Sequence, residues 1–583
     1  MKIKIPVIIL VIIAAATAFI AFSQINKKPF APAEDFPRGA LVYAQINDLP
    51  AFIKLWNESK FKSKYLASEN FGNFRSQHLG RKLASRWSEF NEAGGFSLDL
   101  DTITGLTENR AAIAVYDVGK LEFVFIAPIS DEIFAATKFV QNRNKFAEET
   151  LDDGAIIYRV AVAADRGRQK QELIFANANG RFVLATSEKL LMQTLNNIKG
   201  GLAKNRLSDE PAFAALSGKI EPHTAAVWIN QTALNDDYYF KRYWLMSDVA
   251  ELKNIRAGIF DFEIQGDKLI ERRKFLLNKT VKISPFDNAQ AAELLSLLPE
   301  NISFYRLRSA NPATIDEAAK NTMFERRNFD EKQTTNQQVY FSSFDDYDDY
   351  SSDDYGNLSE KFDETITEND EAEPVESRAA ETDFSGFTRS AAPRAVLTFT
   401  EPKILPAPLF VEFNRAAVFD LASPDEFNRQ AFEAAIVRHL AGQTMISAPD
   451  VKLNWESKTE NDLSGRVLKL PGIGIEVCYA MRGKTLILAN DEEFLRNILS
   501  RQNRVKTADD ETPLTAFTVI NLERREDTYD SIFAELSKNK AADGFFTGNI
   551  ESLLDSISDV RKIEIREKHS LNLFEEELIM SFK

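Results

Sequence analysis

Hydrophobic residues recur along most of the chain with either the period-two spacing of strands or the three-to-four spacing of helices. The strand-like runs come in neighbouring pairs separated by short turns. Three such pairs occupy 111–116 with 121–126, 172–176 with 181–186, and 259–264 with 268–276. The second turn is Asn179-Gly180, which is typical of a type I′ hairpin. Paired strands separated by helical stretches predict a mainly antiparallel sheet with helices packed on one face, an α+β fold.

The hydrophobic pattern of the first half of the chain returns in the second half. The sequence 182–188 (FVLATSE) matches 486–492 (LILANDE), and apolar residues at i, i+4 spacing follow each segment. Further pairs of segments match in the same order: 36–43 with 298–305, 130–133 with 423–427, and 227–230 with 518–521. We therefore predict two tandem copies of one α+β unit, at 34–278 and 281–583.

The matched segments also predict local structure. Ser187 and Asp491 are expected to cap a helix in each copy. Another helix is expected to begin at Ser423, where Pro424 takes the first helical position and Glu426 completes a capping box. The helix faces that should lie against the two sheets carry Leu191 and Leu495.

The N-terminus begins with a long apolar segment. Residues 5–22 carry no charge, and as a helix they would span about 27 Å, close to the thickness of a hydrocarbon core. Lys2 and Lys4 precede this segment, while Lys27 and Lys28 follow it, which favours a cytoplasmic N-terminus and an exported remainder. The predicted signal anchor and its tether occupy 1–28.

A cleaved signal peptide is the alternative interpretation of this segment. Ala21-Phe22-Ser23 has the small-x-small pattern of a cleavage site, although an apolar core of 18 residues is long for a signal peptide. Without cleavage, we expect a single-pass protein of a bacterial inner membrane with most of its length extracytoplasmic. With cleavage, the chain would be secreted or periplasmic.

The composition is that of a folded globular protein with an uneven charge distribution. Of the 583 residues, 44% are apolar and 27% are charged, and the net charge of −16 argues against a general nucleic-acid binder. The segment 341–376 holds 14 Asp or Glu and one Lys, so the other 547 residues are nearly neutral, at −3. Because so acidic a segment buries too little apolar surface to fold, we predict a disordered insert at about 326–394.

The residue types of common catalytic and metal sites are scarce. The single cysteine, Cys478, excludes an intrachain disulfide and a thiolate-rich metal site. It alternates with Glu476 and Ala480 along a predicted strand, and we interpret it as a small, buried or half-buried residue. The sequence has neither a His-Glu-x-x-His zinc helix nor a Gly-x-Ser-x-Gly nucleophile turn. We predict no catalytic residue, no cofactor and no metal ligand.

Other weak motifs have structural interpretations. His439 is expected to pack on the apolar stripe of its helix. The segment 483–485 (GKT) resembles the end of a phosphate loop, but Cys478 stands where the first glycine is required, and a hairpin turn is predicted there. The acidic insert also lacks the pattern of a calcium loop. The four histidines fall in different predicted elements and are His78, His223, His439 and His569.

A cluster of aromatic residues is the one candidate contact patch. Tyr239 and Tyr243 lie one helical turn apart, as do Phe240 and Trp244, so the four side chains would share a broad face. Such a face commonly packs a helix onto a sheet. The alternative is a patch that contacts a ligand, a partner or a bilayer.

The opening of the predicted body resembles a family of uncharacterised bacterial exported proteins. Phe-Pro at 36–37, Val-Tyr at 42–43 and Asn-Asp-Leu-Pro at 47–50 are similar to the strand and helix that open this domain of unknown function. The strand of that family has a Leu-Pro-x-x-Ala-x-x-Tyr-like pattern. The resemblance implies an extracytoplasmic, membrane-tethered protein and assigns no functional residues.

The apolar N-terminus, the repeated pattern and the missing catalytic motifs together predict a function. We expect a non-enzymatic, membrane-tethered extracytoplasmic binding or scaffold protein whose partner is an envelope protein, a lipid or a polymer, and not a nucleic acid. An exported hydrolase with an unrecognised site and a carrier of an apolar ligand are the alternatives. Paired carboxylates in a pocket would favour the hydrolase, and a continuous apolar cavity would favour the carrier.

Overall fold

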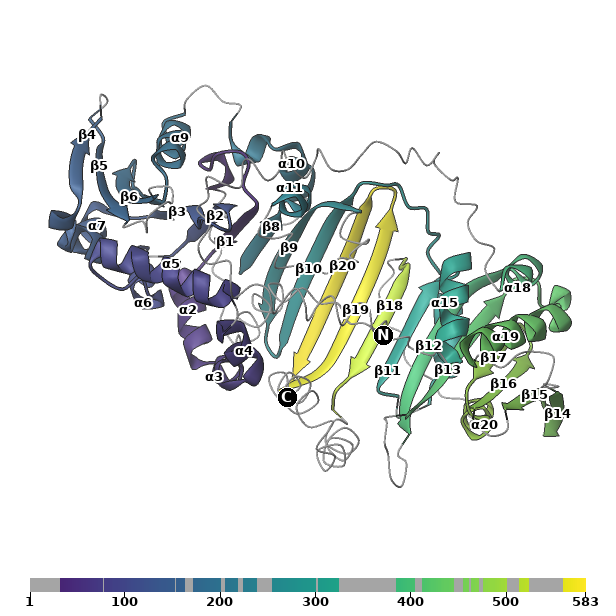
Figure 1. The fold of residues 1–583 in the computed structure, drawn as a ribbon. Coiled ribbons are helices and arrows are strands. Elements are labelled where there is room, and N and C mark those ends of the chain that lie inside the picture. Colours follow the sequence, from purple (N-terminus) through teal and green to yellow (C-terminus); the bar gives the residue numbers. More distant parts are fainter. Residues whose placement is uncertain are drawn as a thin grey trace, which may run out of the picture. The chain divides into compact units, whose positions relative to one another are not determined.

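The computed structural model describes residues 32–523 and 559–583, with gaps inside the first range (Figure 1). The gaps are 77, 108, 152–153, 163–170, 201–204, 219–223, 238–253, 300–301, 324–383, 404–411, 445–453, 461–462, 471–474 and 501–512. The chain divides into two compact units. Met1–Lys282, Leu536–Ile563 and His569–Lys583 form the first unit, and Ile283–Glu535 and Glu564–Lys568 form the second.

The first unit is built on an antiparallel sheet. Its strand order is β4-β5-β6-β7-β3-β2-β1-β8-β9-β10-β20, and each strand is hydrogen-bonded to the next in that order. The strands are β1 (Val42–Ile46), β2 (Ala111–Asp117), β3 (Glu122–Pro128), β4 (Ala147–Thr150), β5 (Ile156–Val162), β6 (Gln171–Ala178), β7 (Arg181–Ala185), β8 (Ala225–Ile229), β9 (Ile255–Gln265), β10 (Lys268–Leu277) and β20 (Leu573–Phe582).

Helices cover both faces of this sheet. Val124 and Ile126 of β3 belong to a core that includes Leu191 of α9, whereas Phe125 belongs to a second core that includes Phe139 of α8. Because alternate residues of a strand point to opposite faces, the two cores lie on opposite sides of the sheet. The prediction that helices pack on one face is therefore wrong. Strands of this sheet have apolar residues on both faces, so both faces of the sheet must be covered by other elements.

The helices of the first unit vary in length. The short helix α8 buries only Phe139, whereas α9 buries most of an apolar face. They are α2 (Leu49–Glu58), α3 (Lys60–Ala67), α4 (Glu69–Ser76), α5 (His78–Gly94), α6 (Leu100–Thr104), α7 (Asp131–Ala136), α8 (Lys138–Gln141), α9 (Glu188–Ile198), α10 (Pro211–Ser217) and α11 (Gln231–Asp236), with 3-10 turns η1 (Pro32–Glu34), η2 (Arg143–Lys145) and η3 (Leu207–Asp209).

The second unit has a sheet of the same kind. Its strand order is β14-β15-β16-β17-β13-β12-β11-β18, again antiparallel throughout. The strands are β11 (Phe304–Ser309), β12 (Pro393–Lys403), β13 (Glu412–Leu421), β14 (Trp455–Glu460), β15 (Leu463–Leu470), β16 (Ile475–Arg482), β17 (Thr485–Ala489) and β18 (Ala516–Asn521). β19 (Val560–Ser570) is divided between the units, with Glu564–Lys568 assigned to the second.

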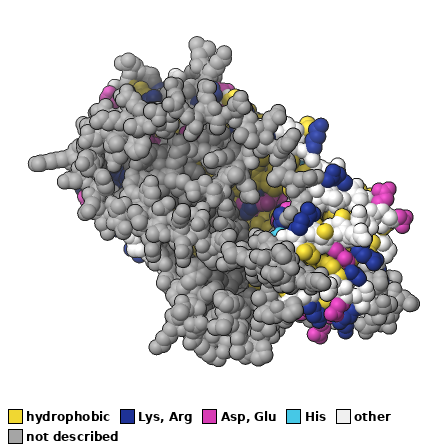
Figure 2. Space-filling model, turned by 45° about the vertical axis from the view of Figure 1, so that its right-hand side comes forward, with side chains coloured by type: hydrophobic (Ala, Val, Ile, Leu, Met, Phe, Trp, Pro, Cys, Tyr) yellow, Lys and Arg dark blue, Asp and Glu magenta, His cyan; other side chains and the backbone are white. Residues whose placement is uncertain are grey.

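The second sheet is also covered on both faces. Ile487 of β17 joins a core with Leu495 of α20, while its neighbour Leu488 joins another with Phe432 of α19. The helices are α14 (Asn288–Leu295), α15 (Pro312–Thr322), α18 (Ser385–Ala391), α19 (Arg429–Thr444) and α20 (Glu492–Ser500), with the 3-10 turn η5 (Pro424–Glu426). Figure 2 shows a described surface on which side chains of both charges are interspersed with small apolar areas.

The first eight strands of the first unit's order, from β4 to β8, correspond to the order of the second unit when each strand number is raised by ten. The register corresponds as well. Tyr43 of β1 lies opposite Trp228 of β8, and Tyr305 of β11 lies opposite Val519 of β18. Likewise Val183 of β7 pairs with Ile126, in the way that Ile487 of β17 pairs with Val418. Apart from Ile126 and Val418, these residues come from the segments that match in sequence.

Most local predictions agree with the structure. The three predicted hairpins are present, and both turn residues of the second, Asn179 and Gly180, have positive φ. Asp491 caps α20 by accepting a hydrogen bond of 2.8 Å from the amide of Phe494. Ser187 stands at the N-cap of α9, but its side chain forms no capping hydrogen bond.

Two local predictions are wrong. Ser423 precedes only the 3-10 turn η5, and its side chain makes no capping hydrogen bond. The turn does not continue as a helix, because the backbone is extended at Phe427 before α19 begins. The predicted disordered insert extends too far, since Phe384 and Phe387 are buried and α18 is folded. The rings of Phe384 and Phe387 pack against Phe432. This end of the predicted insert folds because it contains large apolar side chains to bury, unlike the acidic segment before it. The rest of the predicted insert, 326–383, lies outside the described residues.

The N-terminal prediction also falls outside the described part of the chain, which begins at Pro32. Among the helices that the structure describes, none is both long and apolar enough to cross a bilayer. The apolar segment 5–22 therefore stays a prediction from sequence.

Candidate functional site

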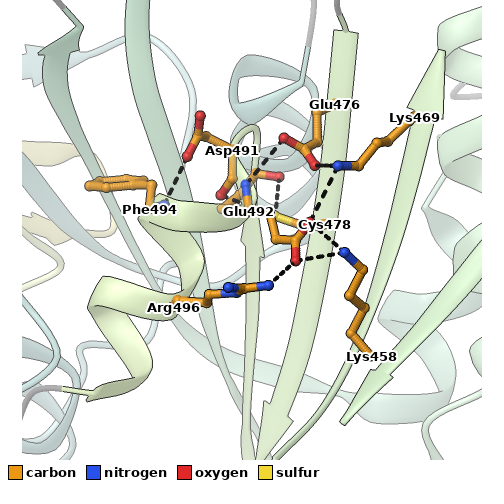
Figure 3. A network of polar contacts seen from close by, with 9 residues as sticks. Lys458, Lys469, Glu476, Cys478, Asp491, Glu492, Phe494 and Arg496 are labelled. Carbon is orange, nitrogen blue, oxygen red and sulfur yellow. Dashed lines mark hydrogen bonds and ion pairs between the residues drawn. The ribbon is translucent and has the colours of Figure 1, made fainter. Parts of the chain in front are cut away.

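Charged side chains from four elements of the second unit surround the first turn of α20 (Figure 3). The carboxylate of Glu492 accepts hydrogen bonds of 3.0 Å to each oxygen from Nζ of Lys458, on β14. Nζ of Lys469, on β15, lies 3.4 Å from the same carboxylate, and Arg496 of α20 pairs with it one helical turn later. Glu476 of β16 completes the group at 3.1 Å from Lys469. We call these five residues the Glu492 cluster.

The local sequence fixes where Glu492 lies. The Asp491 cap begins α20, and Phe494 and Leu495 bury their side chains in the core below the helix. Figure 3 shows Phe494 directed away from the charged groups. Glu492 therefore occupies the first helical position, where a carboxylate is stabilised by the partial positive charge of the helix N-terminus. Its backbone amide also donates to Glu476 at 3.4 Å.

The cluster holds its groups in their charged states. Partial burial by itself would raise the pKa of Glu492, but hydrogen bonds from three cations outweigh it and lower the pKa to about 2. The hydrogen bond and the charge of Glu476 raise the pKa of Lys469. At neutral pH Glu492 is therefore a fixed anion, and a carboxylate with so low a pKa is poorly suited to general acid or base catalysis.

Cys478 lies next to the Glu492 cluster, but its side chain is buried and uncharged. Its side chain is completely buried, and Sγ lies 3.2 Å from the backbone carbonyl oxygen of Asp491. Burial, together with the negative charges of nearby acidic residues, raises the pKa of the thiol well above its usual range. The prediction of a buried cysteine is confirmed. A thiol kept protonated in this way is a poor nucleophile.

The first unit has a cluster at the equivalent position. Glu188 is the first residue of α9, and it accepts a hydrogen bond of 3.1 Å from Nη1 of Arg159 on β5. Arg159 also pairs with Glu149 of β4 at 2.7 Å. Glu188 and Glu492 are matched residues of the repeated segments 182–188 and 486–492. In both units, the first carboxylate of the helix is therefore tied to the outer hairpin of the sheet.

Other buried or half-buried ion pairs lie within and between the elements of each unit. In the first unit, the completely buried Glu271 accepts two hydrogen bonds from Arg273, which also pairs with Glu576 of β20. Burial raises the pKa of Glu271, and the attraction of Arg273 opposes that rise. In the second unit, Glu433 of α19 accepts hydrogen bonds from Tyr479 and Arg466. Arg273 therefore connects β10 to β20, and Glu433 connects α19 to β15 and β16.

The other residues singled out from sequence are not brought together. His439 is buried on α19, as predicted, and His569 stacks on Phe574 with ring centroids 4.5 Å apart. Gly483 and Lys484 form the turn between β16 and β17, as predicted. The backbone of His78 begins α5. The candidate aromatic patch and one histidine lie outside the described residues: Tyr239, Phe240, Tyr243, Trp244 and His223.

Sequence reasoning missed the Glu492 cluster. Lys458 is 34 positions from Glu492 along the chain, so no motif connects them. The available signal was the match of Glu188 with Glu492 at the start of the repeated helix. In the described part of the chain, no group of three or more His, Cys, Asp or Glu side chains is arranged to hold a metal ion.

Comparisons with known proteins assign no family. No family model and no curated protein matches the chain. Among solved structures, crystal form III of TP0453 aligns with a TM-score of 0.23 and 11% identity, over 47% of this chain and 87% of that chain. Crystal form I of the same protein aligns with a TM-score of 0.23 and 12% identity, over 46% of this chain and 84% of that chain.

Proposed function

We propose that this chain is a non-enzymatic binding or scaffold protein of the bacterial cell envelope. In this proposal, residues 5–22 cross the inner membrane once and both folded units lie on the extracytoplasmic side. The uncharged segment of 18 residues, with Lys2 and Lys4 before it, supports the membrane tether.

The observation that carries the non-enzymatic part is the state of the Glu492 cluster. Its charged groups are paired with one another, the pKa of its central carboxylate is about 2, and the thiol beside it is buried. Its counterpart at Glu188 occupies the same place in the first unit. An arrangement that recurs at the same structural position favours a structural role in both copies.

We also propose that the two units are tandem copies of one ancestral unit. The corresponding strand orders, the equivalent register of Tyr43 and Tyr305, and the matched positions of Glu188 and Glu492 support this proposal. A scaffold with two similar units could bind two similar partners, or two sites on one polymer.

Fractionation of cells tests the tether. We expect the full-length chain to remain in the inner-membrane fraction after high-salt and alkaline washes. Protease added to spheroplasts should digest the folded units from outside. Recovery of the full-length chain in the soluble cytosolic fraction would contradict the proposal.

Crosslinking and activity assays test the scaffold role. Crosslinking of the full-length chain in its native envelope should give a reproducible adduct with one macromolecule. Purified protein should not turn over ester, peptide or glycoside substrates. Turnover that is lost in Glu492→Gln but kept in Glu493→Gln, an exposed neighbour on the same helix, would show an enzyme instead.

A further inference from the structure

One helical segment of the first unit has a charge opposite to that of the whole protein. Residues 54–87 comprise the end of α2, all of α3 and α4, and the first part of α5, and we call them the basic lobe. The basic lobe contains eight Lys or Arg and two Glu, a net charge of +6, whereas the chain carries −16. A concentration of cations in an acidic protein indicates an anionic partner.

The basic lobe contributes little to the core that it adjoins. Leu49 and Ile53 of α2 and Phe90 of α5 are buried on either side of it. From 54 to 85, by contrast, Gly80 is the only buried residue among those whose side chains are described. The helices α3 and α4 therefore lie between α2 and α5 (Figure 1), and those of their apolar side chains that the structure describes are partly in contact with solvent.

Those partly exposed residues are large and mostly aromatic. Leu66 is 43% exposed and Trp87 is 38% exposed, so two large apolar side chains of the basic lobe are in contact with solvent. Trp56, Tyr65, Phe71 and Phe74 are half-buried.

The cations of the basic lobe lie next to these aromatic rings. Nζ of Lys62 lies 6.0 Å from the centroid of the Trp56 ring, and the guanidinium of Arg75 lies 5.9 Å from that of Phe71. Lys64 lies 3.8 Å from Asp559, so part of its charge is balanced within the unit. Lys54, Arg75 and Arg81 are exposed.

We propose that the basic lobe binds the surface of a bilayer that contains anionic lipids. Lys and Arg attract anionic headgroups, while Trp, Tyr and Leu enter the boundary between headgroups and acyl chains. An acidic protein would match the charge equally well. The exposed Trp87 and Leu66 favour the bilayer. Aromatic and apolar side chains are stabilised at the membrane–water interface, where they contact acyl chains on one side and water on the other.

This inference does not depend on the N-terminal tether, and the experiment separates the two. Full-length protein is mixed with liposomes of phosphatidylcholine alone, or of phosphatidylcholine and phosphatidylglycerol in equal parts, each containing brominated lipid. Flotation reports membrane attachment, and quenching of tryptophan fluorescence reports contact of the basic lobe. We expect phosphatidylglycerol-dependent quenching at about 0.1 M salt that is lost near 1 M salt, where the Debye length falls from about 10 to about 3 Å.

Substitutions assign the quenching to the basic lobe. The phosphatidylglycerol-dependent part should disappear in Trp56→Phe/Trp87→Phe. Reversal of three exposed charges, in Lys54→Glu/Arg75→Glu/Arg81→Glu, should weaken contact at least a hundredfold, since each cation contributes severalfold or more near an anionic surface. The matched control reverses three exposed cations elsewhere in the first unit and should leave the quenching unchanged: Arg143→Glu/Lys189→Glu/Lys199→Glu.

Each outcome decides the question. Equal quenching with both lipid compositions, or equal loss in the control, would overturn the proposal. Polyglutamate that binds the protein through the basic lobe, while phosphatidylglycerol liposomes do not, would replace the bilayer with an acidic protein. Failure to float with phosphatidylcholine alone would contradict the tether only, because flotation with phosphatidylglycerol would still support the basic lobe.

Discussion

Glu492 couples the stability of the second unit to pH. Its pKa is about 2 in the folded protein, below the ordinary value of 4.5, so folding favours the charged form. The resulting stabilisation is complete above the ordinary pKa and is lost as the pH falls through about 2. We expect Glu492→Gln to lower the free energy of unfolding at neutral pH by on the order of 2 kcal/mol, because exposed partners screen part of the attraction.

Urea unfolding at neutral pH and near pH 2 measures this effect. The difference between wild type and Glu492→Gln should shrink at the lower pH, where the wild-type carboxylate is about half protonated in the folded protein. Glu493→Gln, which changes an exposed residue of the same helix, is the control. A loss of the same size at both values of pH would mean that packing, and not charge, explains the effect.

The thiol of Cys478 should report the opening of the second unit. Because the side chain is completely buried and its pKa is raised by burial, we expect no reaction with an aromatic disulfide reagent in the native state. In increasing urea, labelling should follow the unfolding of the second unit measured by circular dichroism. Rapid labelling without urea would show that the strand carrying Cys478 opens locally.

Single residues were predictable where the signal was local. The alternation of Cys478 with Glu476 and Ala480 was enough to predict its burial, which the structure confirms. The charged partners of Glu492 were not predictable, because Lys458 and Lys469 come from strands whose pairing is decided by the whole sheet. Ion pairs between distant segments leave no pattern in the sequence.

At the scale of elements, the Asn179-Gly180 turn provides a test of hairpin formation. Gly180 has φ +71°, a conformation that costs a residue with a side chain about 1 kcal/mol. We therefore expect Gly180→Ala to lower the unfolding free energy of the first unit by about 1 kcal/mol. Gly218→Ala is the matched control, since Gly218 follows α10 with φ −71° and has open space around it. Thermal or urea unfolding of both variants measures the difference, and equal effects would contradict this explanation.

Elements were predicted best where neighbours in sequence pair in space. The three hairpins follow from strand pairs flanking short turns, and the structure confirms them. The pairings of β3 with β7 and of β13 with β17 join distant segments, so local patterns could not show which strands meet. Cover on both faces was missed for a related reason. Continuous apolar runs such as 182–185 are buried on both faces of the sheet. The pairing of neighbouring strands into hairpins does not show whether one face or both faces are covered.

At the scale of the whole molecule, the repeated hydrophobic pattern predicted the positions of several strands, whereas the predicted boundary of the second copy differs from that of the second unit. The matched segments that reach β1, β7 and β8 of the first unit reach the corresponding strands β11, β17 and β18 of the second, with equivalent register. The pair 130–133 and 423–427 does not correspond, since a helix begins at the first and only a 3-10 turn at the second. The predicted second copy, 281–583, includes 573–582, but β20 pairs with β10 of the first unit. That pairing joins residues about 300 positions apart, as in the contact of Arg273 with Glu576. A local sequence pattern does not predict it, because it is decided by the order of the strands in the folded sheet.

The correspondence of the two units can be tested through their cores. Leu191 and Leu495 are matched residues, and each is nearly or completely buried between a helix and a sheet. Truncation to Ala removes the same buried groups at the same structural position, so each variant should lose about 2–5 kcal/mol of unfolding free energy. Met192→Ala and Asn497→Ala, at exposed positions of the same helices, should change it by less than about 1 kcal/mol.

Unfolding followed separately in each unit would show whether the losses correspond. Tryptophan fluorescence serves this purpose, because Trp228 is buried in the core that contains Leu191 and Trp455 packs in the second unit. Leu191→Ala should shift the transition seen by Trp228, and Leu495→Ala the transition seen by Trp455. A large loss of unfolding free energy for one leucine with none for the other would mean that the matched segments contribute unequally to the stability of their units. The proposed duplication would then rest on strand order alone, without equivalent packing of the two cores.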